Sequence, residues 1–275
     1  MIYREFEPSP RLRSIVDRLW WLEGSPASIA ADPIPPDGHT EIIVHAGEPF
    51  AQREADSSWR VQEPLLLAGQ ATRAVHVEPR GYARLVGARL TPDGAYALFG
   101  QPQYEIVDRI ADLRDIDRVF ARRLRDEVAV LDDGPRMVAA LDRTLQIAVP
   151  DRLEPSVAHG AVRIAIGSHG LVRVADLARQ VDVGSRQLER VFHERIGLSP
   201  KVLLRILRFQ QVLRTLRGGE TRNRWAEVAV DNGFYDQAHF IHDFRSFVGE
   251  SPSAFQVTDE SLAAAFSTIL RSPSR

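Results

Sequence analysis

Cysteine is absent from the 275 residues of this sequence. Its absence excludes disulfides, thiol nucleophiles and metal sites built from thiolates, and it favours the reducing cytoplasm as the location of the protein. Long hydrophobic runs are absent too, since no stretch approaches the roughly 18 apolar residues of a membrane span. Residues 1–10 lack the apolar core of a signal peptide. We therefore expect a cytoplasmic protein with no membrane partner.

Net charge is also small, at −2, and by itself it points to no polyanionic partner. The charge is distributed unevenly, however. Residues 155–256 hold 14 arginine and lysine residues against 10 aspartate and glutamate residues, whereas the rest of the chain holds 21 against 27. Such an asymmetry indicates that one part faces nucleic acid. The length and the 44% content of apolar residues predict a globular chain of two domains.

Short strands are predicted to dominate residues 1–100. Apolar segments rich in strand-forming residues occur at 41–45, 64–69 and 83–90, bounded by turn signals of proline and glycine. Strands at this spacing are typical of a small barrel or sandwich. The sequence therefore predicts a β-rich, barrel-like N-terminal domain.

Helical periodicity in the first 150 residues is local. Apolar residues recur at intervals of three and four near residues 12–22, and again over 116–131 and 137–148. A brief helix is expected at 95–99, where Gly100 can end it. The last two helices have two interpretations: a solvated surface over an ordinary core face, or a hairpin that dimerises with a second copy.

A domain boundary is predicted at residues 149–155, which contain two prolines. It separates residues 1–150, β-rich up to 100 and helical over 105–150, from an all-α domain at 156–257. The expected fold class of the whole chain is thus α+β.

An internal repeat occupies residues 174–252. From Gly184 and Asp236 onward the copies stay in step at a separation of 52 residues, so that Phe192 matches Phe244 and both copies end in Gly-x-Ser-Pro. A repeat of this length indicates two copies of one supersecondary unit. Each copy has a short apolar helix, a tight turn and a second helix, which predicts two helix-turn-helix units.

One long helix is predicted between the copies. Ser199-Pro200 provides an N-cap and a first-turn proline, and Gly218-Gly219 ends the helix. A helix of about 18 residues spans about 27 Å. Such a rod can hold two recognition helices roughly one DNA turn, about 34 Å, apart.

The outward face of each second helix is set by periodicity once the apolar residues point inward. Arginine can bond guanine O6 and N7, glutamine can bond adenine N6 and N7, and alanine or isoleucine can meet the thymine methyl group. The residues predicted to contact DNA are Ser185, Arg186, Glu189 and Arg190 in the first copy and Gln237, Ala238, Ile241, His242 and Arg245 in the second. His193 is expected on the same outward face.

These segments resemble the DNA-binding domain of the AraC/XylS family of bacterial transcription regulators. The resemblance covers residues 160–256 and rests on Leu-Glu-Arg-Val-Phe at 188–192, Gly-Phe-Tyr-Asp-Gln-Ala-His-Phe at 233–240 and both Gly-x-Ser-Pro closures. It implies that most of the positions just named face DNA. His242 stands where the family usually has arginine, and a neutral imidazole cannot make the forked contact of arginine. We therefore expect the first copy to dominate affinity.

The N-terminal part resembles, more weakly, the effector and dimerisation domains of a subset of AraC-like regulators, through residues 36–45, 68–70 and 87–95. This resemblance implies a barrel-like sensor. The candidates for effector binding are Trp20, Trp21, His39 and Glu41. The two tryptophans are neighbours in the chain and cannot face the same way, so one of them can line a ligand site.

His39, Glu41 and His45 fall on one face of a strand, with His76 on another strand, and this pattern is compatible with either a metal site or a capped turn. No complete ligand motif is present, so we predict neither a metal nor a cofactor.

Two function classes follow. The first is a sequence-specific regulator that binds double-stranded DNA, with a second copy of the chain, a small-molecule effector and RNA polymerase as further candidate partners. The second is a small-molecule-binding or metal-dependent cupin-like enzyme tethered to DNA by its helix-turn-helix domain. We predict the regulator, without enzyme activity. A fusion to an alkyl-acceptor thiol is excluded because there is no cysteine.

Overall fold

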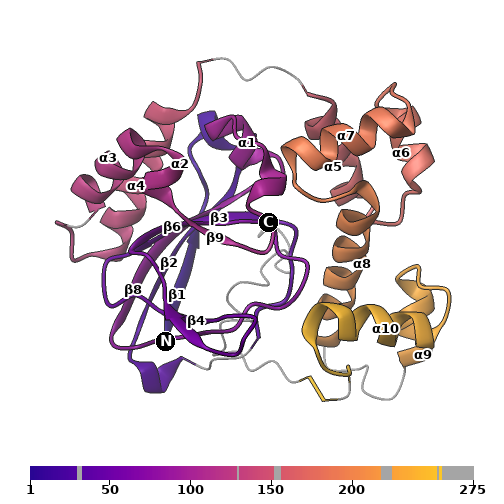
Figure 1. Ribbon diagram of the computed structural model, residues 1–275, viewed down its shortest axis with the longest axis horizontal. Coiled ribbons are helices and arrows are strands. Elements are labelled where there is room, and N and C mark those ends of the chain that lie inside the picture. The colour runs from indigo at the N-terminus through magenta and orange to yellow at the C-terminus, as the bar shows by residue number, and fades with distance from the viewer. Residues whose placement is uncertain (30–32, 129, 152–155, 218–224, 253, 256–275) are drawn as a thin grey trace.

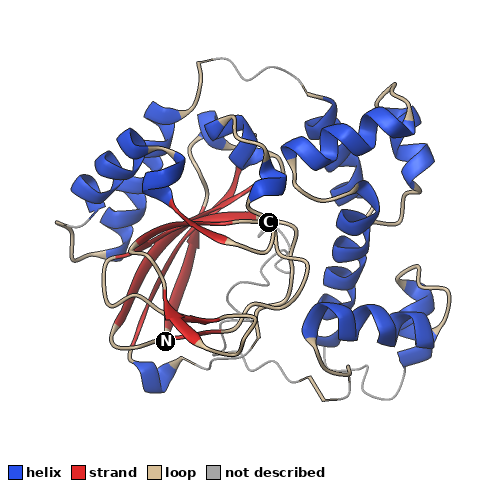
Figure 2. Ribbon diagram, viewed as in Figure 1, coloured by secondary structure: helices blue, strands red, loops and turns tan. Residues whose placement is uncertain are grey.

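The computed structural model describes the chain except for residues 30–32, 129, 152–155, 218–224, 253 and 256–275 (Figure 1). The strands lie in the N-terminal part, and the part beyond residue 156 consists of helices and their connections (Figure 2). The predicted α+β class is therefore confirmed. Residues 152–155 of the predicted linker, the Gly218-Gly219 helix stop and the predicted end at residue 257 lie outside the described residues.

The N-terminal strands form two antiparallel sheets. The larger sheet has six strands in the order β1-β2-β8-β3-β6-β9, and the smaller has three in the order β5-β4-β7. The strands are β1 (Ile2–Phe6), β2 (Val16–Gly24), β3 (Thr40–His45), β4 (Ala51–Arg53), β5 (Trp59–Val61), β6 (Leu65–Ala68), β7 (Val77–Glu78), β8 (Ala83–Leu90) and β9 (Ile110–Asp112). Three of them match the predicted segments, and the described strands make two sheets rather than one closed barrel.

Helices cover one face of the larger sheet. They are α1 (Gly94–Phe99), α2 (Leu113–Ile116), α3 (Arg118–Val128) and α4 (Gly134–Ala148), with short 3-10 turns η1 (Pro10–Leu12), η2 (Pro26–Ser28) and η3 (Gln103–Glu105). Gly100 ends α1 in the left-handed conformation, as predicted. The apolar faces of α3 and α4 join one core with β2 and β8. The face that could have packed on a second copy is therefore occupied by the sheet of the same chain.

The helix indicated near residues 12–22 is wrong, because most of this segment is strand β2. Both faces of β2 are buried: Trp21 packs in the core beneath α4, and Trp20 in a second core toward the smaller sheet. A strand buried on both sides has no alternation of polar and apolar residues, so its apolar spacing can imitate a helix. A Cβ atom at Gly87 would overlap the Trp20 indole, and one at Gly134 the Trp21 indole.

The C-terminal domain contains α5 (Val157–Gly167), α6 (Val174–Gln180), α7 (Ser185–Arg195), α8 (Pro200–Arg217), α9 (Trp225–Asp231) and α10 (Gln237–Val248). Its core is a separate apolar cluster that all six helices surround. Figure 1 shows α8 as a rod with α6 and α7 at one end and α9 and α10 at the other. Of the described helices, none is long and apolar enough to cross a membrane.

Candidate nucleic-acid interface

The predicted repeat is present in the backbone. In the first turn Val183 N–H donates to the Ala178 carbonyl at 3.0 Å, and in the second Phe234 N–H donates to the Ala229 carbonyl at the same distance. Both alanines are buried, as expected where two helices meet at a tight turn. The two units are therefore built by the same hydrogen bond between equivalent residues.

The helix ends repeat as well. Gly197 and Gly249, 52 residues apart, both have φ in the left-handed region, at 84° and 89°. Only glycine adopts this conformation without strain, and it turns the chain away after α7 and after α10. The Gly-x-Ser-Pro closures thus have a structural reason to recur.

The second helix of each unit has one buried face and one exposed face. Leu188 and Phe192 of α7, like Phe240 and Phe244 of α10, are fully buried. Eight of the nine predicted DNA-contacting residues are exposed: Ser185, Arg186, Glu189, Arg190, Gln237, Ala238, His242 and Arg245. The ninth, Ile241, is half-buried and packs against the C-terminal core. The structure thus brings the predicted residues together in two groups, one on each recognition helix.

The two recognition helices are capped differently. Asp236 accepts the N–H of His239 at 2.7 Å and so caps α10. Gly184 precedes α7 and offers no side-chain acceptor. At the start of α8, Ser199 Oγ accepts the N–H of Val202 at 3.3 Å, as its predicted N-cap role requires.

Arginines of α8 hold the second unit in place. Arg205 makes a forked ion pair with Asp243 of α10, at 2.6 and 3.0 Å, and the Asp243 side chain is only 3% exposed. Arg208 lies over the Phe234 ring at 5.6 Å, and burial lowers the pKa of its guanidinium. The sequence alone is compatible with two roles for these arginines, a solvated helix face or contacts with phosphate. The available signal was Asp243, a carboxylate one residue before the buried Phe244.

The N-terminal domain contacts the C-terminal ends of both recognition helices. Tyr104 stacks on His193 with ring centroids 4.4 Å apart, and Arg195 lies over the Tyr96 ring at 4.4 Å. At the other end of the rod, Ala74 N–H donates to the Phe247 carbonyl of α10 at 2.6 Å. His193 was expected on the free outward face, and the structure instead places it in this interdomain contact.

The middle of α8 also touches the N-terminal domain. Gln210 Nε2 donates to the Pro36 carbonyl at 2.5 Å, and Gly38 lies against Leu203. Gly38 has φ of 84°, so any larger residue would be strained there as well as crowded. The N-terminal domain therefore contacts both helix-turn-helix units and the rod between them.

The candidate effector residues lie inside the N-terminal domain. The side chain of Glu41 bonds Arg89 at 2.9 Å, and Arg89 is fully buried. Burial raises the pKa of the Glu41 carboxyl, while the Arg89 charge opposes that rise. His39 Nδ1–H donates to the Leu90 carbonyl at 2.7 Å. With buried Trp20 and Trp21, these candidates occupy the two sides of the sheet rather than one common site.

The metal alternative has no geometry to support it. Among the described residues, no group of three or more His, Asp or Glu side chains is arranged to hold an ion. His45 Nε2–H donates to Gln62 at 3.1 Å, and burial lowers the pKa of His45 to about 4. His76 lies on the β4–β7 side, next to Arg53. The four candidate ligands therefore have separate environments.

Two family models match separate parts of the chain. A family model for a helix-turn-helix domain matches residues 177–257, and one for a domain of unknown function (DUF6597) matches residues 4–112. No curated protein matches the chain. Among solved structures the chain is similar to ToxT from Vibrio cholerae, at 10% identity with a TM-score of 0.45, covering 92% of this chain and 97% of that one. It is also similar to the AraC-like transcriptional activator CuxR, at 15% identity with a TM-score of 0.22, covering 74% of each chain.

Two helix-turn-helix units on a shared helical rod define a DNA-binding protein. The family match spans both recognition helices and both Gly-x-Ser-Pro closures. Residues 177–257 are accordingly a helix-turn-helix domain, as the description of the matching family model states.

Proposed function

We propose that this protein binds specific double-stranded DNA through the N-terminal halves of α7 and α10, and that its N-terminal domain adjusts this binding in response to a small molecule. In this proposal residues 1–150 form the sensing domain, and residues 156–257 form the DNA-binding domain. The protein acts in the cytoplasm, without enzyme activity.

The observation that carries the proposal is that the arginines of α7 differ in whether they contact the N-terminal domain. Arg195 is engaged by Tyr96, whereas Arg186 and Arg190 are exposed and have no hydrogen bond or ion pair with the described residues. They lie in the first half of the helix, which is the part that enters the major groove in helix-turn-helix proteins. Free guanidinium groups at this place suit bidentate contacts with guanine.

The second recognition helix supports a weaker contact. Gln237 and Ala238 lie in its first turn, and His242 and Arg245 follow on the exposed side. Glutamine can read adenine, and Arg245 can bind phosphate, but His242 lacks the fork of Arg190. The first unit therefore provides most of the affinity in this proposal.

In this proposal, regulation acts through the contacts between the two domains. Because the N-terminal domain touches the ends of α7 and α10 and the middle of α8, a change in its conformation would alter the orientation of the two readers. A second copy of the chain would double the number of half-sites, and RNA polymerase is a further partner of the bound regulator. Sedimentation analysis of the full chain, alone and with DNA, tests the dimer.

The test of the function is selection of DNA from a random double-stranded library by the purified full chain. We expect an enriched sequence with two half-sites about one helical turn apart, protected in a footprint and weakened by added salt. Arg136→Ala on α4 removes an exposed arginine of the N-terminal domain and serves as the control for loss of a surface charge. This variant should bind the selected DNA as tightly as the unaltered chain does. Recovery of no common sequence would contradict the proposal.

A further inference from the structure

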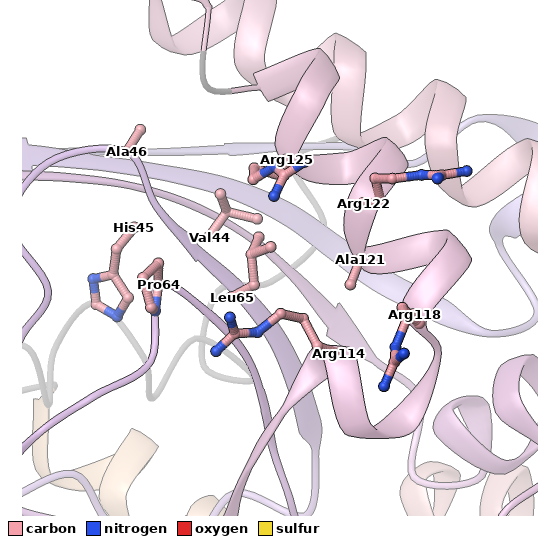
Figure 3. A pocket seen from close by; sticks show the side chains of 10 residues that line it. All are labelled: Val44, His45, Ala46, Pro64, Leu65, Arg114, Arg118, Ala121, Arg122 and Arg125. Carbon is pink, nitrogen blue, oxygen red and sulfur yellow. The ribbon is translucent and has the colours of Figure 1, made fainter.

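A cavity of about 330 Å³ lies between the larger sheet and the helices on its outer face (Figure 3). Its base is formed by the end of β3, the start of β6 and the buried Ala121 of α3. Its rim is formed by four arginines, namely Arg114, Arg118, Arg122 and Arg125. We call this cavity the arginine pocket.

The arginines share one face because of their spacing. Arg118, Arg122 and Arg125 are separated by four and three residues on α3, so they project on the same side of the helix. Arg114 comes from the preceding helix α2. Figure 3 shows the four side chains on the helical side of the pocket, with Arg118 and Arg122 extending in different directions. Like charges at this spacing on one helix repel each other, so the arrangement is unfavourable without an anion.

Among the described residues, two of the four arginines have an ion-pair partner. Arg114 pairs with Asp112 and Glu63, and Arg125 pairs with Asp126. Arg118 and Arg122 have no hydrogen bond or ion pair with any residue that the structure describes, and no carboxylate is among the ten residues that line the pocket. The pocket therefore has two cationic groups available to a ligand.

The base of the pocket is apolar and uncharged. Val44 and Leu65 are nearly fully buried, and they lie beneath the arginines. His45 adds no charge at neutral pH, because burial lowers its pKa to about 4. A recess of this size with an apolar base and a few polar groups at its rim has the form of a small-molecule site.

We propose that the arginine pocket binds a small organic anion, whose carboxylate or phosphate group meets Arg118 and Arg122 while its apolar part covers Val44 and Leu65. Arginine binds both groups through paired hydrogen bonds. Figure 1 places α3 and α8 on opposite sides of the N-terminal sheet, so the pocket faces away from the DNA-reading helices. A small molecule therefore fits this site better than the phosphates of the same DNA.

Strand β3 runs between the arginine pocket and the segment of the N-terminal domain that contacts the DNA-binding domain. The pocket end of β3 carries Val44, and its other end follows the segment in which Pro36 and Gly38 touch α8. A ligand that shifts β3 would thus act on the interdomain contact directly. This consequence, unlike the binding itself, rests on the proposed function.

Binding is tested by titration calorimetry on the full chain without DNA, using cyclohexanecarboxylate and phenyl phosphate as probes. Their neutral analogues, cyclohexanecarboxamide and phenol, share the apolar part and lack the charge. We expect at least one anion to bind at millimolar concentration or better and the neutral analogues to bind at least tenfold more weakly, since a charge-assisted contact is worth about that factor. The anion that binds tells a carboxylate site from a phosphate site.

The variants Arg118→Gln and Arg122→Gln should each weaken anion binding about tenfold, because each removes one charged partner. Arg123→Gln on the same helix, an exposed arginine outside the pocket lining, is the matched control and should leave affinity unchanged. Thermal melts of all three variants exclude unfolding as the cause. The proposal is overturned if neither anion binds, or if an anion and its neutral analogue bind equally well. It is also overturned if Arg118→Gln and Arg122→Gln leave anion affinity unchanged, or if a short oligonucleotide displaces the bound anion.

The two proposals fail separately. Anion binding without recovery of a DNA site leaves the pocket intact and removes the proposed function. Recovery of a DNA site without anion binding supports the proposed function and removes the proposal about the arginine pocket. If both hold, adding the anion should change the affinity of the unaltered chain for the selected DNA, and Arg118→Gln should need about ten times more anion for the same change.

Discussion

The two helix-turn-helix units share a backbone and differ in how they are held and in what they expose. The first has an uncapped recognition helix with two free arginines and a C-terminal end that rests on Tyr104 and Tyr96. The second has an aspartate cap and a buried ion pair to α8. The buried positions are apolar in both copies because they build the unit, whereas the exposed positions differ, as we expect if the two units contact different bases.

The largest effect is expected from breaking the buried ion pair that joins the second unit to α8. Asp243→Ala leaves the partly buried Arg205 without its carboxylate, which should destabilise the α8–α10 contact by about 3–5 kcal/mol. The measurement is the free energy of unfolding of the full chain from denaturant titration, with hydrogen exchange to locate the loss in α9 and α10. Asp176→Ala is the matched control, because it breaks an exposed pair with Arg179 in the first unit and should cost less than about 1 kcal/mol. Equal losses in both variants would refute this difference between the units.

The next effect concerns DNA affinity. Arg190→Ala should weaken binding to the selected site by about 1–3 kcal/mol, and His242→Ala, at the equivalent position 52 residues later, by less than about 1 kcal/mol. The physical reason is the bidentate contact that arginine can make and a neutral imidazole cannot. A gel-shift titration compares the two variants. A larger loss for His242→Ala would reverse the proposed order of the units.

A smaller effect is expected at the cap of the second recognition helix. Asp236→Ala removes the acceptor of the His239 N–H and should lower the free energy of unfolding by about 1 kcal/mol. Denaturant titration measures it. The control is Asp231→Ala, which removes an exposed carboxylate and should leave the free energy of unfolding nearly unchanged. Asp182 is not used as the control, because its φ of 53° makes any substitution there change the backbone as well.

The smallest effect is expected from giving α7 of the first unit an N-cap residue with a side-chain acceptor, which Gly184 lacks. Gly184→Ser should raise the free energy of unfolding by a few tenths of a kcal/mol, since glycine is already an acceptable N-cap. A Cβ atom at Gly184 meets no other atom within 4 Å, so the change introduces no clash. A clear loss of stability would show that the cap of α7 is restrained by something other than its side chain.

The repeat could be predicted from the sequence because its signals are local. The Gly-x-Ser-Pro closures, the apolar spacing of Leu188 and Phe192 and the cap at Asp236 each concern residues within a few positions of one another. The 18 residues of α8 agree with the predicted length for the same reason. Local patterns constrain a helix strongly, since its hydrogen bonds and capping contacts span only three or four residues.

The errors in prediction arise from contacts between distant segments. Strand β2 was mistaken for a helix because Trp20 and Trp21 are both buried, on opposite faces of a sheet whose second covering layer the sequence does not reveal. His193 was expected to be free because the stacking partner Tyr104 lies 89 positions earlier. Neither contact leaves a periodic signal in the segment concerned.

The sequence alone determined that this chain has two copies of a helix-turn-helix unit on a rod, and which side of each recognition helix is apolar. Helical periodicity decides both, because burial of one face leaves the other for a partner. Only the tertiary structure decided which arginines are free. It paired Arg205 with Asp243 and Arg195 with Tyr96, and it left Arg190 at one site and Arg118 and Arg122 at another without partners among the described residues. A guanidinium group becomes available to a ligand only when folding places no carboxylate or ring beside it, and residue type and spacing do not contain that information.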